Sequence, residues 1–114
     1  ETSMTIILPM PVSANRYWRT FRGRTVVSAE AKAYKEQVAW IAKAAGVEKL
    51  DGDIAVTVRV YRPAKRGDLD NSLKVSLDSL NGIAYTDDSQ IVRIVAERYD
   101  DKRNPRVEVE VTAA

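Results

Sequence analysis

The residues with the most telling chemistry lie in the segment Arg66-Gly67-Asp68-Leu69-Asp70-Asn71-Ser72-Leu73-Lys74. Two carboxylates, Asp68 and Asp70, stand two residues apart, and an ammonium group follows at Lys74. A second acidic pair, Asp87-Asp88, comes after one short helical pattern and a turn. Carboxylate oxygens suit hard divalent cations, and a bound cation can activate water beside a phosphate. The pattern therefore indicates a metal site for phosphate chemistry.

The composition narrows the chemistry further, because the 114-residue chain contains no histidine and no cysteine. The lack of histidine excludes Ser-His-Asp triads, imidazole bases and almost every zinc enzyme. The lack of cysteine excludes disulfides and thiolate chemistry, and it fits the cytoplasmic location that we expect. No apolar run approaches the ~20 residues of a membrane span, so we expect no membrane partner. Catalysis must then use Asp, Glu, Lys, Arg, Tyr or a bound metal.

The basic residues are informative through their distribution rather than their number. The net charge is only +2, from 18 basic and 16 acidic residues, which is weak evidence for a nucleic-acid partner. One basic group, however, falls within a predicted hairpin with an aromatic tip, and another leads into the first acidic motif. Such arginines typically contact phosphates, although a hairpin can also simply carry a solvated basic face. The candidate phosphate-binding residues are Arg16, Arg19, Arg22, Arg24 and Arg66.

The hydrophobic spacing predicts one α+β domain over residues 4–114, a mixed β-sheet with two helices packed on one side. Residues 1–3 precede Met4, which we interpret as the natural start, so we expect them to be an addition to the natural chain. We expect the strands that begin at residues 91 and 106 to pair as a hairpin. The predicted strands are 5–8, 16–19, 24–27, 54–60, 91–96 and 106–111; the predicted helices are 29–45 and 70–80.

These elements predict how the acidic motifs meet. We expect Asp70 to cap the second helix, and Asp68 to point the same way along an extended segment. The strand from residue 91, if it lies beside residues 54–60, would return Asp87-Asp88 to the same place. Each signal also has an ordinary structural interpretation. Asp70 alone can be only a cap, Asp87-Asp88 a solvated turn, and Lys74 with Asp78 a surface pair.

Two blocks of the sequence resemble the RusA family of Holliday junction resolvases, at compatible spacing and in the same order from about Ile6 to Val111. The resemblance is specific because neither block is a generic motif. The first block is Asn15-Arg16-Tyr17-Trp18-Arg19, Arg22-Gly23-Arg24-Thr25, Val27-Ser28 and Ala33-Tyr34; the second is Asp68-Leu69-Asp70-Asn71 with Lys74, Asp78-Ser79-Leu80 and Asp87-Asp88-Ser89-Gln90-Ile91.

The resemblance implies a homodimeric endodeoxyribonuclease that makes paired, symmetric nicks in four-way junction DNA during recombination and repair. It implies Mg²⁺ or Mn²⁺ as the cofactor and no small-molecule cofactor. By position, Asp68, Asp70 and Asp88 match the family's catalytic, metal-binding aspartates. Lys74 matches its catalytic lysine and Asn71 an asparagine beside the active site.

Two other functions remain open from the residues alone. One is a non-catalytic DNA-binding module, in which the arginines hold phosphates and the acids are caps and turns. The other is a metal nuclease that acts on other branched DNA or on duplex. The pair Asp68 and Asp70 favours an enzyme, because a pure DNA-binding protein gains nothing from carboxylates beside its basic groups.

Overall fold

The protein is an α+β domain with a mixed sheet, as the sequence predicts. The computed structural model describes residues 3–10, 18–21, 24–63 and 69–114, and within these ranges the side chains of residues 18–21, 24–27 and 69–72 are not described. The elements, in chain order, are β1 (Ser3–Leu8), β2 (Trp18–Phe21), β3 (Arg24–Val27), α2 (Ala29–Ala44), β4 (Ile54–Arg62), α3 (Leu69–Ser79), the 3₁₀ turn η1 (Asp88–Gln90), β5 (Ile91–Asp100) and β6 (Arg106–Ala113).

Four strands form the main sheet in the order β1-β6-β4-β5. The strand β5 runs parallel to β4, whereas β6 is antiparallel to both β4 and β1. The expected pairing of β5 with β6 is therefore wrong, because β4 lies between them. The turn after β5 passes the end of β4, where the Asp101 amide donates to the Arg62 carbonyl over 2.8 Å. The Arg62 guanidinium also contacts the Asp100 carboxylate at 2.6 Å.

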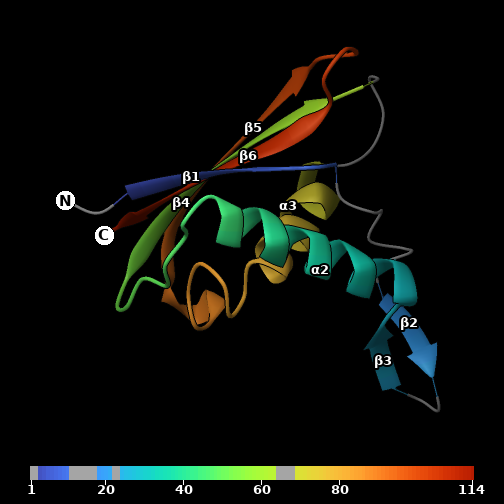
Figure 1. Ribbon diagram of the computed structural model, residues 1–114, viewed down its shortest axis with the longest axis horizontal. Helices are drawn as coiled ribbons and strands as arrows, with labels where there is room; N and C mark the ends of the chain where they lie inside the picture. The colour runs from blue at the N-terminus through green and yellow to red at the C-terminus, as the bar shows by residue number, and fades with distance from the viewer. Residues whose placement is uncertain (1–2, 11–17, 22–23, 64–68) are drawn as a thin grey trace.

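Both long helices lie on one side of the sheet (Figure 1), and they share a single apolar core with that face. The strand β4 buries every second residue, from Ile54 to Val60, and β6 does the same from Val107 to Val111. The register places these residues on one face, with Val109 opposite both Ile6 and Val58. The helices and the turn after α3 complete the core with Ala31, Tyr34, Val38, Val75, Leu77 and Leu80.

The helix α2 begins where its sequence predicts and ends at Ala44, one residue before the predicted end, with Ala45 as its C-cap. The Ser28 hydroxyl accepts a hydrogen bond from the Ala31 amide at 3.1 Å, which is the geometry of an N-cap. Gly46 follows the helix with φ of 73°, a conformation that glycine adopts without steric cost. The buried Tyr34 hydroxyl donates to the Pro9 carbonyl at 2.8 Å, so α2 fixes the chain where it leaves β1.

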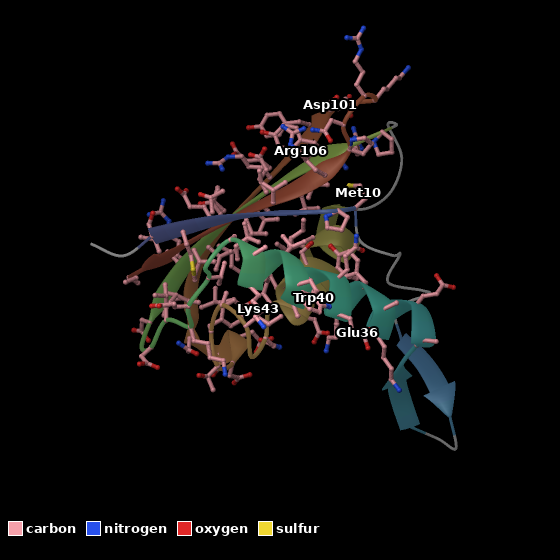
Figure 2. The ribbon with its side chains drawn as sticks, viewed as in Figure 1. Met10, Glu36, Trp40, Lys43, Asp101 and Arg106 are labelled. Atoms are coloured by element: carbon pink, nitrogen blue, oxygen red, sulfur yellow. The ribbon has the colours of Figure 1, made fainter. Side chains whose placement is uncertain are left out.

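The opposite face of the sheet carries alternating charges. Arg59 lies between Glu97 and Glu110, at 3.6 and 3.8 Å. Arg106 contacts Asp101 at 3.0 Å, and Figure 2 shows this pair beyond the helices, at the end of the sheet where β5 turns into β6. Such partly exposed pairs add little stability, but they give this face a polar character without covering it.

The strands β2 and β3 form a separate antiparallel hairpin, in which Trp18 pairs with Val27 and Phe21 with Arg24. This confirms the predicted hairpin. Figure 1 shows it beyond the start of α2, away from the main sheet. None of the helices in the described part of the chain is long and apolar enough to cross a membrane.

Candidate active site

The second acidic pair lies on a turn that one side chain holds in place. Asp87 is the N-cap of η1 and Asp88 its first residue. The side-chain oxygen of Gln90, Oε1, accepts hydrogen bonds from the backbone amides of Thr86 and Asp87, at 2.8 and 3.1 Å. The side-chain nitrogen of Gln90, Nε2, donates to the backbone carbonyl oxygens of Leu50 and Gly52, at 2.9 and 2.8 Å. Gln90 therefore ties the acidic turn to the segment that precedes β4.

The two carboxylates of this turn have different surroundings. Asp87 accepts a hydrogen bond from the Ser89 hydroxyl at 2.6 Å, and this bond is the main cause that lowers the pKa of Asp87. The neighbouring Tyr85 is fully buried, and its hydroxyl donates to the Leu77 carbonyl of α3 at 2.7 Å. Burial raises the pKa of Tyr85, and the negative charge of Asp88 raises it further. Of the two carboxylates on this turn, Asp88 is the one whose charge raises the pKa of Tyr85, and Asp78 of α3 raises it as well.

The first acidic motif lies at the start of α3. The helix begins at Leu69, so Asp70 is within its first turn rather than at the N-cap, which corrects the expected capping role. A carboxylate in the first turn still favours the helix through the positive end of its dipole. Lys74 is exposed one turn further on. Asp78 forms an ion pair with Lys35 of α2 at 3.3 Å, which supports a structural role for Asp78.

The topology determines how far apart the two motifs lie along α3. The helix follows the end of β4, whereas the acidic turn precedes β5, which starts beside the beginning of β4. Because Tyr85 binds the Leu77 carbonyl, the acidic turn is close to the last turns of α3. Asp70 is seven residues before Leu77, a rise of about 10 Å along the helix axis. Lys74 lies on the same helix, between Asp70 and Leu77.

Several predicted site residues lie outside the described residues: Asp68, Arg16, Arg22 and Arg66. For Asp70, Asn71, Arg19 and Arg24 the description covers the backbone, which lies in α3, β2 and β3, and not the side chain. Within the described side chains, no group of three or more acidic residues could hold a metal ion. The expected metal set of Asp68, Asp70 and Asp88 therefore stays a prediction.

A shallow pocket of about 240 Å³ lies elsewhere, on the outer face of α2. Its lining residues are Glu36, Ala39, Trp40 and Lys43, and Figure 2 shows three of them along the helix. None belongs to the acidic motifs or to the basic hairpin. The Lys43 ammonium stands 5.7 Å from the Trp40 ring, an ordinary cation–π distance at a surface. This pocket is not the candidate active site.

Sequence reasoning missed the roles of Gln90 and Tyr85. A signal for Gln90 was present, because an acidic cap followed three residues later by glutamine is a capping-box pattern. No comparable signal marked Tyr85, whose contact with Leu77 depends on how the loop after α3 folds back.

The comparison with known proteins decides the family. The family model described as "Endodeoxyribonuclease RusA" matches residues 8–112. The chain belongs to the RusA family. The crossover junction endodeoxyribonuclease RusA of Escherichia coli strain K12 is 39% identical over 114 residues, which cover 95% of this chain and 92% of that protein. The corresponding protein of Enterobacteria phage 82 is 38% identical over 113 residues, covering 94% and 92% of the two chains.

A third relative, from Shigella sonnei strain Ss046, is 37% identical over 95% of this chain and 92% of its own. These RusA relatives align along nearly their whole lengths, so the match includes both acidic motifs and the basic hairpin. The family assignment that the sequence motifs suggested is confirmed.

Proposed function

We propose that this RusA-family chain is a divalent-metal-dependent endonuclease that resolves four-way DNA junctions by two symmetric nicks. The observation that carries the proposal is the tightly held acidic turn beside α3. Asp88 stands on that turn, next to the helix that bears Asp70 and Lys74. The names of the relatives, crossover junction endodeoxyribonucleases, support the same reaction.

The donor chemistry fits a hard divalent cation. The candidate ligands are the carboxylates of Asp68, Asp70 and Asp88, and the chain has no histidine or cysteine to favour a softer metal. The Asp87 carboxylate already accepts a hydrogen bond from the Ser89 hydroxyl, which favours Asp88 as the metal ligand of the pair. A bound Mg²⁺ or Mn²⁺ would supply an activated water and would stabilise the charge that develops on the phosphate.

The other residues have roles that follow from their positions. The exposed Lys74, one turn into α3, is placed to stabilise the charged transition state or the departing oxygen. The first turn of α3, which includes Asn71, offers free amide groups to a DNA phosphate. The arginines of the hairpin and Arg66 would bind other phosphates in a salt-dependent way.

The partner that we propose is four-way junction DNA, bound by a homodimer. A four-way junction has two-fold symmetry, and one chain with one acidic site can cut only one strand at a time. A two-fold dimer presents two such sites in matching orientation. DNA as the substrate also fits the cytoplasmic location, which we retain as part of the proposal.

The test is a nicking assay with labelled four-way junction and with duplex of the same sequence, each with Mg²⁺ and with EDTA. We expect paired nicks in the junction only when Mg²⁺ is present. Binding without cleavage in every metal tested would favour a non-catalytic DNA-binding module. Equal cutting of duplex and junction would indicate a nuclease without selectivity for junctions.

A further inference from the structure

The strand β5 is an open edge of the main sheet. It ends the order β1-β6-β4-β5, so its outer backbone groups have no partner strand among the described residues. In the described part of the chain, five large apolar side chains are exposed, and three of them are on this strand. These are Val92, Ile94 and Tyr99, with exposed fractions of 58%, 46% and 41%. A long, exposed, apolar edge is a template for pairing with another chain.

We propose that β5 pairs with β5 of a second copy of this protein, antiparallel and centred on Val95. In this register Arg93 of each copy lies directly opposite Glu97 of the other. The parallel pairing with β4 places both residues on the open face of the sheet. On the face toward the helices, Ile94 lies opposite Ala96. Opposite charges and apolar pairs at directly opposed positions each stabilise an antiparallel ladder.

Neighbouring registers lack this complementarity. Centring the pair on Ala96 or on Ile94 separates Arg93 from Glu97. Within one copy, Glu97 already lies 3.6 Å from Arg59. In the Val95 register that carboxylate would therefore stand between two guanidinium groups.

The other edge of the sheet is a weaker candidate. The strand β1, Ser3–Leu8, has six residues compared with ten in β5, and no charged side chain that could select a register. One of its side chains, Ile7, is among the exposed large apolar residues. The longer strand with self-complementary charges is the better match for a two-fold contact.

The pairing has a consequence for the active sites. Directly opposed residues of an antiparallel pair point to the same face, so the helices of both copies would cover one face of a continuous sheet. Both acidic turns would then open on the same side, as two cuts in one junction require. The acidic turn precedes the start of β5, so the two turns would lie beyond opposite ends of the paired segment. This inference rests on the homodimer of the proposed function and specifies its interface.

The first test uses the absence of cysteine from the chain. At the two-fold axis, the thiols of Val95→Cys would be directly opposed, with Cβ atoms about 4.5–5.5 Å apart. A disulfide needs only a small adjustment from that distance. Val92→Cys is the matched control, because Val92 lies at the irregular start of β5, before Arg93, and its two thiols would be more than about 13 Å apart along the strands. After mild oxidation, we expect at least tenfold more linked dimer from Val95→Cys than from Val92→Cys.

The second test exchanges the paired charges. We expect Arg93→Glu and Glu97→Arg each to weaken dimerisation by about tenfold or more, and the double variant to restore most of the affinity. Arg103→Glu and Glu36→Arg, both at exposed sites, are controls for net charge. The Glu97 variants also lose the contact with Arg59, so thermal melts must show that each chain is folded. Analytical sedimentation measures the dissociation constant of the dimer for each variant.

The mass of the protein in solution and its cleavage of junctions are measured separately. The β5 interface and the proposed function can then each be refuted without the other. A monomer at micromolar concentration, equal linking of the two cysteine variants, or no rescue in the double variant would overturn the β5 interface. A chain that links through Val95→Cys but leaves junctions intact with Mg²⁺ would support the interface and overturn the proposed function. Paired nicking by a dimer that does not link through Val95→Cys would support the proposed function and overturn the β5 interface.

Discussion

Replacing Gln90 with alanine should disorder the acidic turn and slow cleavage without weakening junction binding. The Gln90 side chain makes four hydrogen bonds, two to the turn and two to the segment before β4. A hydrogen bond of this kind contributes about 0.5–1.5 kcal/mol net. Three of the four are exposed, so water replaces them in part. We expect Gln90→Ala to lower the free energy of unfolding by about 1–3 kcal/mol.

The effect on catalysis should be larger than the loss of stability suggests. Gln90 contacts neither DNA nor metal in this scheme, but it sets the position of Asp88 two residues earlier in the turn. A displacement of about 1 Å at a catalytic group can cost up to about 10²-fold in rate. We therefore expect single-turnover cleavage to fall by about ten- to a hundredfold at low Mg²⁺. Higher Mg²⁺ should recover part of this loss, because a looser carboxylate weakens metal binding.

The assay compares three proteins at a temperature where melting curves show each to be folded: wild type, Gln90→Ala and Gln37→Ala. Gln37 is exposed on α2, so Gln37→Ala controls for the loss of a glutamine side chain. Cleavage is followed against Mg²⁺ concentration, and junction affinity is measured in Ca²⁺. If Gln90→Ala is less stable but cleaves with the wild-type dependence on Mg²⁺, Gln90 is only structural and the positioning argument is refuted.

Four further predictions concern other parts of the proposed mechanism. Asp70→Asn should abolish nicking yet bind junctions in Ca²⁺ at least as tightly as wild type, with about 0.3–1 kcal/mol of stability lost from the helix terminus; normal nicking would remove Asp70 from the site. Lys74→Ala should slow single-turnover cleavage by more than it weakens binding, and a tenfold loss of affinity with unchanged cleavage would make it a binding residue only. Replacing Arg22 and Arg24 should flatten the slope of log affinity against log salt, and an unchanged slope would remove the hairpin from the DNA contact. Because the pKa of Tyr85 is raised in the folded state, the unfolded chain loses that proton first, so stability should fall above a pH of about 10, and Tyr85→Phe should reduce that fall in alkaline melts.

The sequence predicted the elements better than their arrangement. Alternation along Ile54 to Val60 and the serine cap before α2 are local signals, and both elements form as they indicate. The pairing of β5 with β6 was predicted from a short connection alone. That prediction failed because β6 pairs with β4 and β1, and no local signal says which strand is the neighbour.

The candidate site divides in the same way. The residue types and the short spacing of each acidic motif are visible in the sequence and indicate metal chemistry. The placement of the two motifs relative to each other depends on tertiary contacts, and no repeating pattern in the sequence reveals such contacts. One example is the Tyr85 hydroxyl on the Leu77 carbonyl, and another is the pair of bonds from Gln90 to Leu50 and Gly52. Both involve backbone carbonyls, which every residue provides, so the sequence does not identify the partner.

The parallel pairing of β4 with β5 links these observations. A parallel pair needs a crossover, and here α3 supplies it, so the first acidic motif begins the crossover and the second ends it. The separation of the two motifs therefore depends on how firmly the acidic turn is held against the last turns of α3. Tyr85 attaches the turn to α3, and Gln90 attaches it to the segment before β4. Loosening either contact should therefore impair metal-dependent cleavage while leaving the arginine contacts to DNA intact.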